Sequence, residues 1–140
     1  MTDLMNDLDL VAARSSEATK IYGSGETEVR ALDNIDVAFP KGKFTAIMGP
    51  SGSGKSTLMH CMAGLDDLTS GKVFIGETDL TELNERELTL LRRSQIGFIF
   101  QAYNLVPTLN ALENITLPLD LAGEKPDDSW VDKIVEVVSL

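Results

Sequence analysis

Residues 49–57 read GPSGSGKST and are followed directly by LMHCMAGL at 58–65. Gly52 and Gly54 can adopt backbone conformations that other residues avoid, so the chain can turn sharply and direct several N–H groups into one concavity. A helix predicted to begin at this point adds unpaired N–H groups and the positive end of its dipole. Lys55 adds an ammonium group. The stretch therefore predicts a site for a polyanion and has the pattern of a phosphate-binding (Walker A) loop.

The phosphate-loop pattern assigns roles to the side chains that follow the glycines. Lys55 would reach the β- and γ-phosphates of a nucleotide, the Ser56 hydroxyl would bind Mg²⁺, and Thr57 would bond the α-phosphate. A glycine-rich turn without a ligand is the alternative, but the fixed residues together with a strand before them and a helix after them make it rare. The predicted nucleotide-binding residues of this stretch are Gly49, Pro50, Ser51, Gly52, Ser53, Gly54, Lys55, Ser56 and Thr57.

Other ligand-binding patterns fail at specific positions. A dinucleotide fingerprint starting at Gly52 would need a glycine where Thr57 stands. A protein kinase would need a His-Arg-Asp loop, but the single histidine, His60, precedes Cys61. That adjacent pair predicts no metal site, because neighbouring helix positions face different ways. Residues 120–123 match the DxxG motif of GTPases but lie in an apolar helical pattern. A phosphate-loop kinase or GTPase stays a minor alternative.

Strands and helices are predicted to alternate along the chain. Strands are expected at 17–22, 35–39, 44–48, 73–75 and 96–100, and helices after Gly54 and at 85–93, 108–122 and 129–140. The segments 44–48 and 96–100 are short and almost wholly apolar, which is typical of buried parallel strands. The alternation predicts the α/β class with a mainly parallel sheet. The last apolar stripe stops at Leu140 without a glycine or proline, so we expect the chain to be cut there.

Composition excludes several classes of protein. A length of 140 residues allows one domain, and residues 1–14 predict an acidic N-terminal tail rather than a secretory signal. The net charge of −10 argues against a nucleic-acid partner. No segment approaches the roughly 18 apolar residues that a membrane-spanning helix needs. The single cysteine excludes an internal disulfide and fits a reducing compartment.

Two longer stretches carry a resemblance to a known family. GPSGSGKSTLMHCMAGLDDLTSGKVFIGETDL at 49–80 and IGFIFQAYNLVPTLNALENITLPL at 96–119 closely resemble the ATP-binding subunits of ABC transporters. Within the family they are most similar to the branch that serves lipoprotein release, macrolide-type export and cell-division transporters. The resemblance implies an ATP-binding domain over 15–140. It would comprise a P-loop NTPase core of ABC type with an N-terminal antiparallel β part at 15–101, and an incomplete helical subdomain at 102–140.

The resemblance implies roles for residues outside the loop. Tyr22 stands where the family places an aromatic ring that stacks on adenine, although a tyrosine ending a strand before a turn is the alternative. Gln101 stands at the family's Q-loop, where it would touch Mg²⁺ and the attacking water and couple the site to the membrane subunit. Candidates for docking on that subunit are Tyr103, Asn104 and Leu105. The alternative is a purely packing role for Leu105, Leu109 and Leu112.

The family's hydrolytic machinery is missing from this sequence. Hydrolysis needs a placed Mg²⁺ and an oriented water. In the family these depend on a Walker B aspartate, a catalytic glutamate, a switch histidine and an LSGGQ-type signature loop, none of which appears here. The nearest acid-ending strand, 73–77, has Gly76 before Glu77 and is interpreted as structural. We therefore expect the 140-residue chain to bind Mg·ATP without turnover, with Lys55 and Gln101 in supporting catalytic roles.

The leading interpretation is an ABC transporter ATP-binding subunit truncated before the signature loop. The full-length form would bind ATP and Mg²⁺, form a homodimer and energise a transmembrane permease from the cytoplasmic face of the plasma membrane. The alternative is a non-hydrolytic nucleotide-binding module that regulates or titrates a transporter. A central sheet without its later strands would expose an apolar edge, so we expect poor solubility for the isolated chain.

Overall fold

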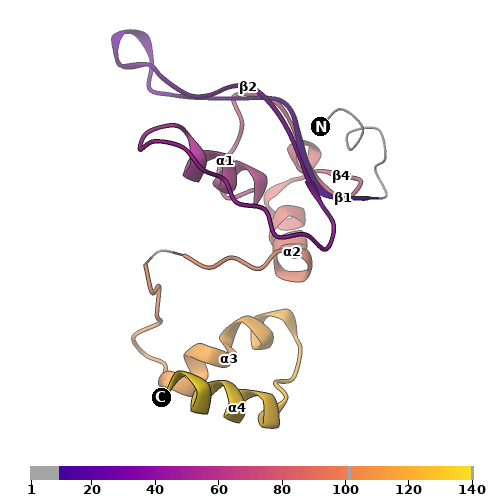
Figure 1. Ribbon diagram of the computed structural model, residues 1–140, viewed down its shortest axis with the longest axis vertical. Helices are drawn as coiled ribbons and strands as arrows, with labels where there is room; N and C mark the ends of the chain where they lie inside the picture. Colours follow the sequence, from indigo (N-terminus) through magenta and orange to yellow (C-terminus); the bar gives the residue numbers. More distant parts are fainter. Residues whose placement is uncertain (1–9, 101, 140) are drawn as a thin grey trace. The chain divides into compact units, whose positions relative to one another are not determined.

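The computed structural model describes residues 10–100 and 102–139. The described residues fall into two compact units, one reaching Leu88 and the other beginning at Thr89 (Figure 1). The division predicted from the sequence, between a core and a helical subdomain, comes later, after Gln101. Gln101 itself lies outside the described residues.

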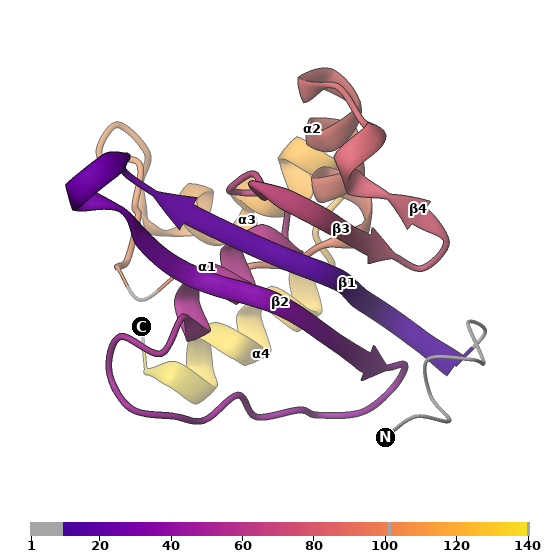
Figure 2. The ribbon, with the colours of Figure 1, turned by 90° about the horizontal axis from the view of Figure 1, so that it is seen from above.

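The described residues of the first unit form a four-stranded antiparallel sheet in the order β2-β1-β3-β4 (Figure 2). Strands β1 (Val11–Tyr22) and β2 (Val29–Pro40) make a long hairpin, with the short 3-10 helix η2 (Gly25–Thr27) in its turn. Strand β3 (Ser70–Ile75) pairs with the other edge of β1, and β4 (Thr78–Asp79) pairs with β3. The N-terminal antiparallel β part that the resemblance implies is therefore present in the structure.

Strand β1 starts well before the predicted strand at 17–22. Val11 is 1% exposed and Ala18 is fully buried, so the strand is enclosed from its first residue to beyond its middle. Residues 11–14 therefore belong to the sheet rather than to the predicted acidic tail. A register shift between Ser15 and Ala18 interrupts the alternation of inward and outward side chains. That irregularity removes the period of two by which a strand is recognised in sequence.

Helix α1 (Lys55–Met62) lies against one face of the sheet (Figure 2). The buried apolar side chains of this unit come from the strands, from α1 with the residue after it, and from the segment beyond β4. They include Ala18, Leu32, Cys61, Met62, Ala63, Val73, Leu80 and Leu88. Leu65 lies beyond the end of this helix and is 42% exposed, because Gly64 turns the chain with a φ of 63°.

Two segments predicted as buried parallel strands, 44–48 and 96–100, are not strands in this structure. The side chains of Phe44, Met48 and Ile99 are 98%, 87% and 97% exposed. Every strand pair among the described residues is antiparallel, so the prediction of a mainly parallel sheet is wrong for them. A strand is stabilised by backbone bonds to a neighbour, and no described residue supplies one to either segment. The α/β class is confirmed.

The remaining helices agree with the sequence pattern in type and position. Helix α2 (Glu85–Gln95) buries Leu88 and Leu91, and the second unit continues with helices α3 (Ala111–Ala122) and α4 (Asp128–Val138). No helix among the described residues is long and apolar enough to cross a membrane. The apolar stripe predicted on the last helix is exposed in this structure, at Trp130, Ile134 and Val138.

Helix α3 begins at Ala111 because its first turn is capped. The side chain of Asn110 accepts a hydrogen bond from the Glu113 N–H at 3.0 Å, and the Glu113 carboxylate accepts one from the Asn110 N–H at 2.7 Å. This reciprocal capping box satisfies two backbone donors, so the helix starts later than the predicted residue 108. Gly123, with a φ of 75°, ends the helix. The DxxG-like stretch is therefore the C-terminal turn of a helix.

Candidate functional site

The glycines of the loop 49–57 serve two different purposes. Gly54 is the N-cap of α1, with a φ of 83°. A Cβ atom at Gly54 would lie 2.3 Å from the backbone oxygen of Ala31, so the loop meets strand β2 too closely for any side chain. Gly52 has a φ of 80° and open space around it, so its requirement is conformational only. Gly54 therefore allows the loop to approach strand β2 closely, and Gly52 allows the chain to reverse direction.

The first turn of α1 supplies hydrogen-bond donors. Gly54 has no side chain to cap the helix, and the first helical bond runs from the Leu58 N–H to the Gly54 oxygen at 2.8 Å. The N–H groups of Lys55, Ser56 and Thr57 precede that bond and have no acceptor within the helix. Together with the positive end of the helix dipole, these N–H groups favour an anion at this end of α1.

The ammonium group of Lys55 lies against the same loop. Its Nζ donates to the backbone oxygens of Gly49 at 3.0 Å and Pro50 at 2.7 Å, and it contacts the Ser53 Oγ at 3.4 Å. The Ser53 N–H in turn donates to the Pro50 oxygen at 3.3 Å. Carbonyl oxygens carry only partial charges, so they orient the ammonium group without neutralising it. The positively charged Lys55 side chain is therefore fixed against the backbone of the loop.

A cavity of about 270 Å³ opens beside the loop. From the loop and α1 it is lined by Ser51, Gly52, Gly54, Lys55, Ser56 and Thr57. The other three predicted loop residues, Gly49, Pro50 and Ser53, contact Lys55 instead. Six of the nine predicted loop residues therefore line one cavity, and the other three lie next to Lys55.

Three lining residues were not predicted from the sequence. Val29, Arg30 and Ala31 at the start of β2 complete the cavity wall. The signal that could have found them is the hairpin, because a strand ending at Tyr22 before a glycine-rich turn must be met by the residues after that turn. In the structure Tyr22 pairs with Val29. Arg30 adds a second cation, held by Asp33 at 2.8 Å.

Tyr22 lies at the end of β1 and is 41% exposed. Its hydroxyl donates to the Asp66 Oδ2 at 2.5 Å. This hydrogen bond to a carboxylate, together with partial burial, raises the pKa of the phenol, and a contact with Thr57 acts in the opposite direction. Tyr22 therefore sits beside two residues that line the cavity, Val29 and Thr57.

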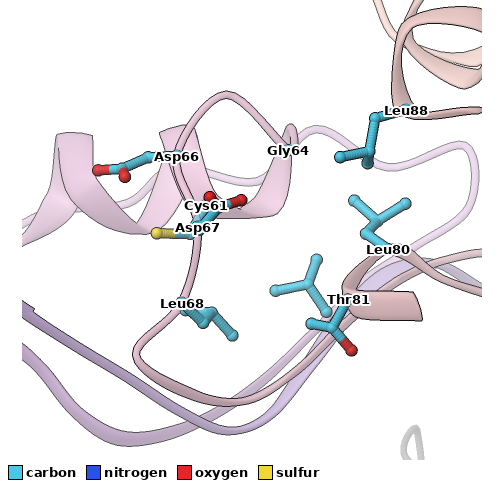
Figure 3. Close-up of a pocket in the computed structure, with 9 residues that line it drawn as sticks. Cys61, Gly64, Asp66, Asp67, Leu68, Leu80, Thr81 and Leu88 are labelled. Carbon is cyan, nitrogen blue, oxygen red and sulfur yellow. The ribbon is translucent and has the colours of Figure 1, made fainter. Parts of the chain in front are cut away.

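Asp66 follows α1 at the edge of a second, much smaller cavity of about 30 Å³ (Figure 3). Leu80 and Leu88 project into that cavity, whereas the Asp66 carboxylate points away from them (Figure 3). Cys61 lines the same cavity and is 3% exposed, so it belongs to the core. Burial, and secondarily the nearby Asp66 charge, raises the pKa of the Cys61 thiol to about 11.

The predicted docking residues lie in the second unit. Tyr103 is 93% exposed and Asn104 has a φ of 50°. Leu105 and Leu109 line an apolar cavity of about 430 Å³ that also includes Val106, Pro107, Ala111, Asn114 and Ile115. Leu105 and Leu112 are 66% and 55% exposed, so neither is packed into a core among the described residues. The role predicted for Gln101 falls on a residue outside the described ranges and stays a prediction.

A glycine-built loop at the N-terminus of a helix, on an α/β fold, defines the class of P-loop nucleotide-binding proteins. Comparison with protein families matches residues 32–140 to the ABC transporter family. The lipoprotein-releasing system ATP-binding protein LolD of Legionella pneumophila (strain Paris) is 44% identical over 125 residues, covering 89% of this chain and 54% of that protein. The macrolide export ATP-binding/permease protein MacB of Hyphomonas neptunium is 48% identical over 107 residues, covering 76% of this chain and 17% of that protein.

Solved structures agree with this match. The ATP-binding cassette MJ0796, described as a dimer in a post-hydrolysis state bound to ADP and Pi, superposes with a TM-score of 0.77 at 40% identity. The superposition covers 89% of this chain and 54% of that one. The chain thus spans about half the length of this cassette and of the lipoprotein-releasing relative. It belongs to the ABC transporter family and corresponds to its ATP-binding component.

Proposed function

We propose that this chain binds Mg·ATP through the loop 49–57, and that the complete protein uses ATP hydrolysis to energise a transmembrane permease. The observation that carries the proposal is the meeting of the Lys55 ammonium group and the first N–H groups of α1 at one cavity. The ADP and Pi held by the cassette MJ0796 give independent support, because that cassette is 40% identical to this chain.

The described residues that line the cavity fit a triphosphate. They carry two cations, Lys55 and Arg30, and no carboxylate, and Arg30 is paired with Asp33 at 2.8 Å. The Lys55 ammonium group therefore supplies positive charge at the cavity, opposite in sign to the chain's net charge of −10. A side chain at Gly54 would not fit against Ala31, so glycine is what allows the helix to begin this close to β2.

The predicted site residues have separate roles in this proposal. Lys55 binds the β- and γ-phosphates, Ser56 holds Mg²⁺ through its hydroxyl, and Thr57 bonds the α-phosphate. Bound Mg²⁺ would neutralise charge on the phosphate oxygens. Gln101, as a second metal-contacting residue, would orient the attacking water. Tyr22 would stack on the adenine ring, an interaction worth ~1–3 kcal/mol.

The proposed partners are a membrane-embedded permease and a second copy of the ATP-binding domain. Tyr103 and Leu105 are exposed, and Leu105 lines the apolar cavity of about 430 Å³, which supports docking of an apolar element of the permease. The solved structure of the related cassette MJ0796 is dimeric, which supports a homodimer. The protein would then be peripheral on the cytoplasmic face of the plasma membrane, and its acidic charge disfavours nucleic acid as a partner.

Nucleotide binding is tested by isothermal titration calorimetry of Mg·ATP into the 140-residue chain and two lysine variants. We expect Lys55→Ala to weaken binding about tenfold or more, because a charge-assisted bond to phosphate is lost. Lys43→Ala is the control, since Lys43 is an exposed lysine that does not line the cavity. Equal affinities for the chain and Lys55→Ala would contradict the proposal. Steady phosphate release by the pure chain would contradict the expectation of binding without turnover.

A further inference from the structure

One carboxylate joins the proposed base-stacking ring to a lysine on the same strand. Asp66 Oδ2 accepts from the Tyr22 hydroxyl at 2.5 Å, and Asp66 Oδ1 accepts from Lys20 Nζ at 2.6 Å. Lys20 Nζ also donates to the backbone oxygen of Asp67 at 2.6 Å. Lys20 and Tyr22 belong to β1, whereas Asp66 and Asp67 follow α1. The phosphate-loop helix and the strand that carries Tyr22 are therefore tied together at this cluster.

The charges of the cluster favour this arrangement at neutral pH. The Lys20 side chain is 12% exposed and that of Asp66 is 30% exposed, so both bonds are partly shielded from water. The bond from Lys20, and then that from Tyr22, holds the pKa of Asp66 below its ordinary value. Asp66 is thus ionised and acts as an acceptor, while the phenol of Tyr22 keeps the proton that it donates.

The cluster also determines which face of the Tyr22 ring is available. The Lys20 ammonium lies 4.9 Å from the ring centroid, within the range of a cation–π contact. It occupies one face, so a planar group would stack on the other. A tyrosine at the end of a strand would otherwise rotate about its side-chain bonds, and a ring bonded at its hydroxyl as well as at its backbone loses that freedom. Less entropy is then lost when a planar ligand stacks on it.

We propose that Asp66 is a positioning residue that holds the Tyr22 ring in the orientation needed to stack on the base of a bound nucleotide. This inference rests on the proposed nucleotide binding. It also gives a physical reason why the site would bind a nucleoside triphosphate more tightly than a triphosphate without a base. Asp66 does not touch the nucleotide. Its carboxylate points out of the small apolar cavity behind it, toward the polar partners on β1 (Figure 3).

A purely structural tie between β1 and the segment after α1 is the competing explanation. Such a tie would support the phosphate loop as a whole, so its loss would weaken every ligand of the loop. A positioning role affects only ligands that carry a base. Inorganic tripolyphosphate has the phosphates of ATP without the base, and it therefore separates the two explanations.

The experiment compares the affinities of Mg·ATP and Mg·tripolyphosphate, measured by calorimetry on the 140-residue chain. We expect Asp66→Asn and Tyr22→Phe each to weaken ATP binding about fivefold to tenfold, within the range of one typical net hydrogen bond. Tripolyphosphate binding should be unchanged in both, which also shows that the loop remains folded. The double variant should bind ATP no more weakly than either single variant, because both substitutions act on the same contact between Asp66 and Tyr22.

The matched control is Asp67→Asn, which removes the same charge one residue away and leaves in place the backbone oxygen that Lys20 uses. It should bind both ligands like the parent chain. If Asp66→Asn lost as much affinity for tripolyphosphate as for ATP, the proposal would be overturned in favour of a structural tie. Unchanged ATP affinity in Tyr22→Phe, or additive losses in the double variant, would overturn it as well. A parent chain that binds neither ligand would overturn the proposed function itself.

Discussion

Burial changes the pKa and the reactivity of the Cys61 thiol. The thiol is 3% exposed, and its pKa is raised from 9.0 to about 11. The thiolate is the reactive form of cysteine, so each unit of pKa above neutral pH reduces the reactive fraction about tenfold. The adjacent cavity, about 30 Å³ in volume, holds little more than a water molecule and gives a reagent no room.

We expect Cys61 of the folded chain to react with iodoacetamide at neutral pH at least about a hundredfold more slowly than in the urea-unfolded chain. The folded-state rate should rise as the pH approaches 11, because the raised pKa moves thiolate formation to higher pH. Mass spectrometry of the alkylated chain over time measures both rates. Similar rates in the folded and unfolded chains would show that the thiol is not enclosed as the structure describes.

Helix α1 and strand β2 determine each other's position through a single glycine. The helix starts at Lys55 directly after Gly54, whose α-carbon faces the backbone oxygen of Ala31 on β2. The same approach brings Val29 and Arg30 to the cavity wall. The contact between these elements therefore builds the ligand cavity as well as the core. A side chain added at Gly54 should therefore lower the free energy of unfolding more than a side chain added at Gly52.

We expect Gly52→Ala to lower the free energy of unfolding by about 1 kcal/mol, because alanine is strained at a positive φ. Gly54→Ala should lower it by about 2–4 kcal/mol, since its Cβ would also overlap the Ala31 oxygen, which is backbone and cannot move aside cheaply. Urea denaturation followed by circular dichroism measures the difference. Equal destabilisation by the two substitutions would mean that the close approach to β2 is absent in solution.

At the scale of the whole molecule, the prominent feature is apolar surface on segments without strand partners. Phe44 and Ile99 are almost fully exposed, and they lie on the two segments that the sequence predicts as buried strands. Exposed apolar groups on extended, unpaired backbone favour association with other chains. The expectation of poor solubility follows from these side chains.

We expect Phe44→Ser to increase the monomeric fraction of the isolated 140-residue chain, because it removes the most exposed large aromatic group of the 44–48 segment. Thr45→Ser, in the same segment, leaves the apolar surface intact and should have no such effect. Size-exclusion chromatography with light scattering gives the monomeric fraction. A parent chain that is already a monodisperse monomer with one cooperative melting transition would contradict this expectation.

The turn, the helix start and the lysine of the phosphate loop could be predicted from the sequence because their physics is local, whereas the strand expected before them at 44–48 is absent from the structure. A reversal at Gly52, a helix starting after Gly54 and an ammonium group at Lys55 need only the backbone preferences of adjacent residues. The helices at 85–95 and 128–138 and the strand at 70–75 were recognisable for the same reason, since each has its own period or boundary residues.

Other features depend on residues that are distant in sequence, and only the tertiary structure decided them. The pairing of β1 with β2 brought Val29 to the cavity, and the end of α1 brought Asp66 to Tyr22. Whether 44–48 and 96–100 become strands depends in the same way on a neighbouring strand, which apolar composition alone does not provide. A sequence pattern indicates which side chains a segment can bury and which hydrogen bonds its backbone can make. Which other segment it pairs with depends on the packing of the whole chain.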